Sequence, residues 1–234
     1  MSSELAALMS ATFHEAGATH VVELVHQKDA AAHRRLASVR LDAYDAGGTQ
    51  RLGRELDPAQ ETLDLDALLG GVGREHGRLL VVFDARYDPQ IFPYRPHHYA
   101  YLHRPGSAAP PLYYAVNATL GGVPDRIGAV ALNNFESYLF LDRPLRERYA
   151  LAVGNLARFA AAEAEVISYY DGERCREEVH LAPKAHAEIA LATERDGRRL
   201  RRVELKTLFR LTSYVVGRRQ DDLVLFDHLF TYFK

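Results

Sequence analysis

Hydrophobic and polar residues alternate along much of this chain, in the way that is typical of strands with one buried face. The clearest stretch is 36–44, where Val39 and Leu41 alternate with Arg40 and Asp42. Side chains along a strand point to opposite faces in turn, so each such stretch has one apolar side to bury. The same pattern, or a short run rich in valine and leucine, predicts strands at 19–26, 61–65, 79–83, 149–153, 163–170, 187–191, 213–216 and 223–226.

The predicted strands follow one another in a similar order in the two halves of the chain. In the first half, a strand ends at Tyr44, and Pro58 follows fourteen residues later and leads into the next strand. In the second half, Tyr170 ends a strand and Pro183 follows after thirteen residues. Matched order and spacing indicate an internal repeat. We therefore predict an all-β protein with two similar antiparallel β-sandwich units in tandem, produced by a structural duplication.

Three stretches do not follow this strand pattern. Leu5, Leu8 and Phe13 fit one side of a short N-terminal helix. Residues 63–69 continue from a leucine–aspartate alternation into apolar residues, which allows a turn of helix. The apolar positions in 192–212 are Leu200, Val203, Leu208 and Leu211. They fit one face of a helix and a bulged strand equally well, so the secondary structure there stays open.

Proline and tyrosine are concentrated between the two predicted units. Seven of the ten prolines lie between Pro89 and Pro124, and five of the thirteen tyrosines lie between Tyr94 and Tyr114. Proline lacks the amide proton that a helix or an inner strand needs, so ordered loops and short edge strands are expected here. We divide the chain into an N-terminal segment (1–17), a first sandwich unit (18–104), a connecting insert (105–148) and a second sandwich unit (149–234).

Three of the eleven histidines lie close together, at His97, His98 and His103. If this segment is extended, four side chains share one face: His97, Tyr99, Tyr101 and His103. Imidazoles beside phenols suit three roles, namely binding a metal, orienting a polar ligand and relaying a proton. Residues six apart on a strand are about 20 Å apart, so His97 and His103 hold one ion only if the strand bends. A purely structural aromatic strand is the remaining alternative.

Polar residues further along the chain extend this candidate site. Tyr113 and Asn117 follow in the insert. Asn134 and Glu136 project to the same side if their segment is extended, and they can complete a polar pocket with the histidines. The alternative is that Asn133 and Asn134 form a turn, because asparagine tolerates a left-handed backbone.

Composition and charge exclude several classes of protein. Twenty-nine basic against thirty-one acidic residues give a formal net charge of −2, which is not the basic excess of a nucleic-acid-binding protein. A single cysteine, Cys175, excludes an internal disulfide framework and a multi-cysteine metal site. The longest apolar run is too short for a membrane span. The first residues do not have the pattern of a secretion signal, so a cytoplasmic location is expected.

One family resemblance arises from the repeated pattern. A strand, a Tyr-Asp-Gly turn, a strand led by proline and a final valine-rich pair of strands occur at 166–191 and 214–228, with a fainter copy at 39–65 and 80–92. This arrangement resembles the small β-sandwich of the sensory rhodopsin transducer family. The resemblance implies a soluble, oligomeric binding protein without established catalysis.

From these observations we predict a non-catalytic binding protein. Its ligand is a small polar molecule such as a saccharide, or a protein partner, because tyrosine offers a broad face and a hydroxyl group. Edge strands need protection, so a homo-oligomer is expected. No cofactor is favoured, since the phosphate-binding loops and serine-elbow motifs are missing from the sequence. The predicted ligand-binding residues are His97, Tyr99, Tyr101, His103, Tyr113, Asn117 and Asn134.

The alternative is a metal-dependent or acid–base enzyme. Its divalent metal would be held by His97, His98 and His103. Glu136 would act as the general base, with His98 as the second catalytic group.

Overall fold

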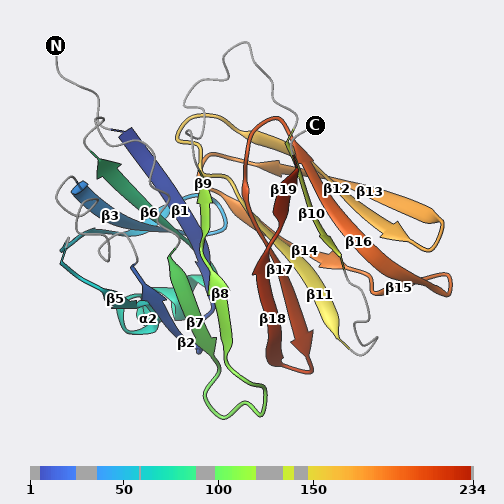
Figure 1. Cartoon of the computed structure of the whole chain (residues 1–234), viewed down its shortest axis with the longest axis horizontal. Coiled ribbons are helices and arrows are strands. Elements are labelled where there is room, and N and C mark those ends of the chain that lie inside the picture. Colours follow the sequence, from blue (N-terminus) through green and yellow to red (C-terminus); the bar gives the residue numbers. More distant parts are fainter. Residues whose placement is uncertain are drawn as a thin grey trace. The chain divides into compact units, whose positions relative to one another are not determined.

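The computed structural model describes residues 6–24, 36–57, 59–87, 98–119, 134–139 and 147–232. It separates into two compact units, Met1–Gly122 and Val123–Lys234, and each is described here by itself (Figure 1). Both units consist mainly of antiparallel strands, which confirms the predicted all-β fold class. Among the described residues, no helix has the length and apolar character to cross a bilayer.

The first unit has two antiparallel sheets. Their strand orders are β4-β3-β6-β1-β9 and β5-β2-β7-β8. The strands are β1 (Ala6–His14), β2 (Thr19–Glu23), β3 (Leu36–Tyr44), β4 (Gln50–Leu56), β5 (Thr62–Asp64), β6 (Leu79–Tyr87), β7 (Tyr99–His103), β8 (Leu112–Ala115) and β9 (Asn117–Thr119).

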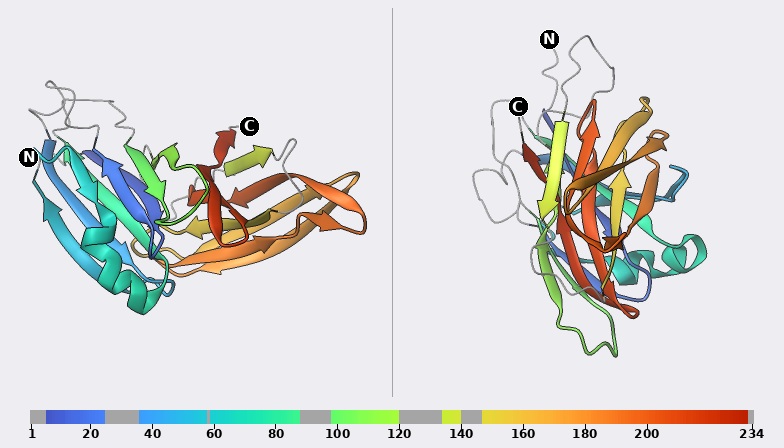
Figure 2. Two further views of the ribbon diagram at one scale, coloured as in Figure 1. Left: turned by 90° about the horizontal axis from the view of Figure 1, so that it is seen from below. Right: turned by 90° about the vertical axis from the view of Figure 1, so that its right-hand side faces the viewer.

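The second unit also has two antiparallel sheets. Their orders are β13-β12-β16-β10-β19, with β15 added to β16, and β14-β11-β17-β18. In Figure 2 the strands of this unit are coloured from yellow-green to red. The strands are β10 (Asn134–Leu139), β11 (Arg148–Gly154), β12 (Ala162–Tyr170), β13 (Glu173–Leu181), β14 (His186–Leu191), β15 (Glu194–Arg195), β16 (Arg198–Thr207), β17 (Thr212–Arg219), β18 (Asp222–His228) and β19 (Phe230–Tyr232).

The two units have the same strand order. The strands correspond in chain order: β1–β5 match β10–β14, and β6–β9 match β16–β19. With this correspondence, each sheet order of the first unit becomes that of the second. The hairpins that the sequence pattern aligns, β3–β4 after Tyr44 and β12–β13 after Tyr170, occupy equivalent places in this order. One difference lies before β6 and β16, where the first unit has a helix and the second has the short strand β15.

The interior of the first unit follows from the pattern of its strands. Val39 and Leu41 are buried, as their alternation predicts. Strand β6 lies between β3 and β1, and every residue from Leu79 to Phe83 is buried. An inner strand covered on both faces needs a continuous apolar run, which explains why this stretch lacks alternation.

The helix α2 (Leu65–His76) closes one part of the first unit. Asp64 caps its N-terminus by accepting a hydrogen bond from the Ala67 amide at 2.9 Å, and Leu65 and Leu69 are buried. Gly73 faces the ring of His14: a Cβ added there would lie 2.7 Å from His14 Cε1. The single turn of helix expected near 63–69 is therefore a helix of 12 residues. Its close approach to His14 depends on Gly73.

Two predictions about secondary structure are resolved or corrected. The N-terminal helix is wrong: Leu8 and Phe13 belong to strand β1, which pairs with β6 along its whole length. The open region 192–212 is largely strand β16, and its pairing with β12 is interrupted by a bulge next to Tyr170. Long-range pairing with a neighbouring strand decides both cases, and local periodicity does not reveal it.

The predicted insert, 105–148, is shared between the two units. Strands β8 and β9 pair with β7 and β1 in the first unit. Strand β10 pairs with β16 and β19 in the second. The division between the compact units falls after Gly122, within the insert.

Two glycines of α2 give a matched test of this packing. Replacing Gly71 by alanine should stabilise the first unit by about 0.5–1 kcal/mol, because helix propensity rises and nothing lies within 4 Å of the new methyl group. Replacing Gly73 by alanine should destabilise it despite the same gain, because the methyl group meets the His14 ring. Urea unfolding of both variants measures the difference, and equal stabilisation would contradict the described packing.

Candidate functional site

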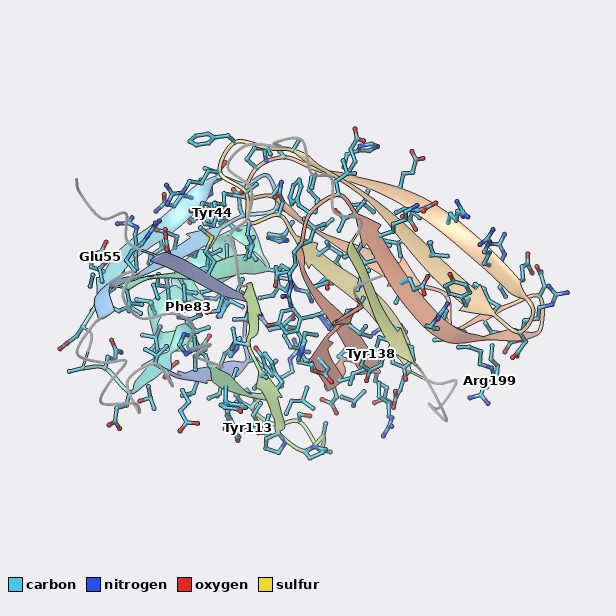
Figure 3. The ribbon with its side chains drawn as sticks, turned by 45° about the horizontal axis from the view of Figure 1, so that its top comes forward. Tyr44, Glu55, Phe83, Tyr113, Tyr138 and Arg199 are labelled. Atoms are coloured by element: carbon cyan, nitrogen blue, oxygen red, sulfur yellow. The ribbon has the colours of Figure 1, made fainter. Side chains whose placement is uncertain are left out.

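Strands β7 and β8 bring the predicted tyrosines to one side of a sheet. Tyr101 pairs with Tyr113, and Tyr99 pairs with Glu23 of β2. Paired residues point to the same face, so all four side chains project from the outer side of the β5-β2-β7-β8 sheet. We call this surface, formed by Tyr99, Tyr101, Tyr113 and Glu23, the tyrosine face. Figure 3 labels Tyr113 on β8.

The tyrosine face is ordered and exposed. The exposed fractions of Tyr99, Tyr101 and Tyr113 are 37%, 38% and 64%. The rings of Tyr99 and Tyr113 are stacked, with centroids 5.5 Å apart and an interplanar angle of 5°. The Tyr113 hydroxyl donates a hydrogen bond to Glu23 Oε2 at 3.1 Å. Large rings are thus held in fixed positions while much of their surface stays in contact with water.

The histidines predicted for this site separate. His98 is buried, its ring edge packs on Phe83 with centroids 5.6 Å apart, and its carbonyl accepts from the Val116 amide at 2.7 Å. His103 is half-buried and lies opposite Thr19 on the outer side of the sheet. His97 lies outside the described residues. The His98 side chain is therefore directed away from the tyrosine face, whereas His103 lies on the same side of the sheet as the tyrosines.

The remaining predicted residues lie on strands in two different units. Asn117 is on β9 and pairs with Ala11 in the first unit. Asn134 and Glu136 are on β10 and pair with Thr207 and Leu205 in the second. Their side chains, like the whole of Asn133, lie outside the described part of the molecule. Within that part, no group of three or more His, Cys, Asp or Glu side chains is arranged to hold a metal ion.

A buried polar cluster lies on the inner side of the same sheet, and sequence reasoning missed it. The Tyr114 hydroxyl is 2.7 Å from Thr12 Oγ1 and 2.8 Å from His20 Nε2. Because Thr12 is on β1 and His20 on β2, this hydroxyl links the two sheets of the first unit. The rings of His14 and His20 are stacked, with centroids 6.3 Å apart, and both side chains are fully buried.

Burial keeps this histidine pair neutral. Burial, together with the nearby His14, lowers the pKa of His20 to about 3. Burial also lowers the pKa of His14, although Asp66, whose Oδ1 is 3.7 Å from His14 Nε2, and Glu15 act in the opposite direction. A sequence signal existed for His20, which is in phase with the inward residues Val22 and Leu24. At His14 the signal is ambiguous, because the apolar spacing before it also fits a helix.

The second unit carries a shallow hollow on the outer side of β13, β12 and β16, with a volume of about 290 Å³. Glu165 lies at its centre and pairs with Glu178 on one side and Lys206 on the other. Charges of both signs in adjacent positions are typical of a solvated surface. The other lining residues are Glu163, Ala164, His180, Thr207 and Leu208.

Comparison with protein-family models, curated proteins and solved structures finds no match for this chain. The resemblance to the sensory rhodopsin transducer family therefore stays a prediction, and the functional argument rests on the geometry of the sites.

Two adjacent tyrosines test the assigned roles. Tyr114→Phe should destabilise the first unit by about 1–3 kcal/mol, because Thr12 and His20 lose a buried hydrogen-bond partner. Tyr113→Phe should change stability by less than about 0.5 kcal/mol, because its hydroxyl is on the exposed face. Chemical denaturation of both variants measures these effects. Equal losses would contradict the link between the sheets.

The histidine pair predicts a loss of stability in acid. Below pH 6.5 the unfolded chain binds protons at these histidines while the folded unit does not, so the free energy of unfolding falls as the pH falls toward 3. At one pKa unit per 1.36 kcal/mol, the shift of the His20 pKa from 6.5 to about 3 contributes a loss of up to roughly 5 kcal/mol. Urea unfolding at pH 7, 6 and 5 should show a smaller pH dependence in His20→Leu than in the wild type.

The control for this experiment is Val22→Ala, which removes buried volume from the same strand without removing a titrating group. Its stability should be lower at every pH, with the pH dependence of the wild type. A His20→Leu variant with that same unchanged pH dependence would show that the buried pair is not the source of acid sensitivity.

Proposed function

We propose that this chain is a non-catalytic binding protein that recognises a protein partner through the tyrosine face. The observation that carries the proposal is the ordered, exposed set of Tyr99, Tyr101 and Tyr113 on one sheet. Tyrosine is enriched at the centre of protein interfaces, where it supplies contact area at a small entropic cost.

A protein partner fits this surface better than a small polar ligand such as a saccharide. Small-ligand sites are concave and bury most of the ligand. The rings of Tyr101 and Tyr113 instead project from a sheet, with exposed fractions of 38% and 64%. Two of these rings are held by stacking and by a hydrogen bond to Glu23, so little ordering is required when a partner binds.

The enzymatic alternative receives less support from the described residues. An acid–base mechanism requires its groups to lie within hydrogen-bond reach of one reacting atom. His98 packs against Phe83 in the interior of the first unit. The fully buried His14 and His20 are inaccessible to a substrate in this conformation.

We also infer that the two units arose by duplication. The support is the shared strand order of all four sheets, together with the matched spacing of the aligned hairpins. The homo-oligomer predicted from the edge strands and the cytoplasmic location stay predictions.

Site-specific photocross-linking tests the proposed function. A benzoylphenylalanine residue in place of Tyr101 should cross-link in cells to one protein, identified by mass spectrometry. The matched control places the same residue at Arg54, which is exposed on β4 in the other sheet of the first unit. Cross-linking at both positions to the same extent, or at the Arg54 position alone, would contradict the proposal.

A combined variant provides the second arm of this experiment. Tyr99→Ser and Tyr113→Ser should abolish the cross-link from position 101, because the partner loses its aromatic contacts. The melting temperature of the variant should change little, since both side chains are exposed. An undiminished cross-link in a folded variant would show that these tyrosines do not form the interface.

A further inference from the structure

We propose that the partner presents an arginine side chain to the tyrosine face, so that a guanidinium group lies between the tyrosine rings and Glu23. This inference rests on the proposed function and specifies the chemistry of the partner. It is supported by an arrangement of the same chemical groups in the second unit and by the charges around the tyrosine face.

The second unit contains a tyrosine, a glutamate and an arginine in contact with one another. Tyr169 on β12 pairs with Arg202 on β16, and the Arg202 guanidinium carbon lies 4.1 Å from the centre of the Tyr169 ring. The Tyr169 hydroxyl donates to Glu204 Oε2 at 2.5 Å, and Arg202 Nη2 is 2.9 Å from Glu204 Oε1. The guanidinium thus contacts a π-surface and a carboxylate at the same time, which favours arginine over lysine.

The tyrosine face presents the same two kinds of acceptor. The Tyr113 hydroxyl donates to a carboxylate oxygen of Glu23, as the Tyr169 hydroxyl does to Glu204. The Tyr99 ring is stacked next to this pair, and Tyr101 lies opposite Tyr113. A guanidinium approaching from the solvent side therefore meets electron-rich rings and a carboxylate within one small area.

The charges of the surrounding face also favour a cation. Glu23 pairs with Tyr99, so its carboxylate is on the same side of the sheet as the rings. His103 is at the other end of β7, opposite Thr19. Arg104 follows β7 in the turn toward β8 and is exposed. The end of the face at Tyr99 and Tyr113 is thus the acidic end, and a cationic side chain is complementary to it.

An NMR titration with capped amino acids tests this inference on the full chain. The probes are N-acetyl-arginine methylamide, its lysine counterpart and its citrulline counterpart, which has the shape of arginine without the charge. The arginine probe should shift the ring signals of Tyr99, Tyr101 and Tyr113 in a saturable way. Citrulline should bind at least about twofold to fivefold more weakly, as expected when a surface cation–π contact is lost.

Variants and an internal reference make the result specific. Glu23→Gln should weaken arginine binding by about twofold to fivefold, whereas Glu55→Gln, at an exposed site on β4, should leave it unchanged. The Tyr169 signals should not shift, because Arg202 already covers that ring. Equal binding of citrulline and arginine, or an unchanged affinity in Glu23→Gln, would overturn the inference.

The two proposals fail in different ways. If the arginine probe shows no preference but the cross-link from position 101 persists, the face binds a protein through other chemistry and only the arginine inference is wrong. If the cross-link is missing as well, the proposed function itself is wrong.

Discussion

One hydroxyl group joins the two sheets of the first unit through hydrogen bonds. Tyr114 of β8 reaches inward to Thr12 of the opposite sheet and to His20 of its own. This contact fixes which way β8 faces, because successive side chains of a strand point to opposite sides. With Tyr114 held inside, Tyr113 must face outward, next to Tyr99 and Tyr101. The tyrosine face is thus positioned from the interior of the unit.

A buried core that contains two imidazoles is stable only while both imidazoles are neutral. The stacked rings of His14 and His20 satisfy this condition at neutral pH, because burial lowers the pKa of both. Gly73 allows α2 to approach the His14 ring closely, and Asp66 of the same helix lies near its Nε2. The helix, the histidine pair and the tyrosine bridge therefore form one connected structure behind β8.

Strands with a clear pattern of their own could be predicted from the sequence, and contacts between distant residues could not. Alternation located 36–44 as a strand and placed Tyr99, Tyr101 and His103 on one side. The same period explains why His98 faces inward. The contact between Tyr113 and Glu23 joins residues ninety positions apart, and its register is set by pairing with β7. In β16 the bulge places the buried Leu200 and Val203 three positions apart, a spacing that also fits a helix. In β1 the spacing of the leucines fits a helix in the same way.

Side-chain footprinting by hydroxyl radicals, compared between the purified protein and living cells, tests most directly whether the tyrosine face is a recognition surface. The account predicts that Tyr99, Tyr101 and Tyr113 are oxidised in the purified protein and protected in cells. Phe159 of the second unit, 77% exposed, serves as the reference and should be oxidised equally in both. Tyrosines oxidised to the same extent in cells and in the purified protein would contradict the account, as would equal protection of Phe159.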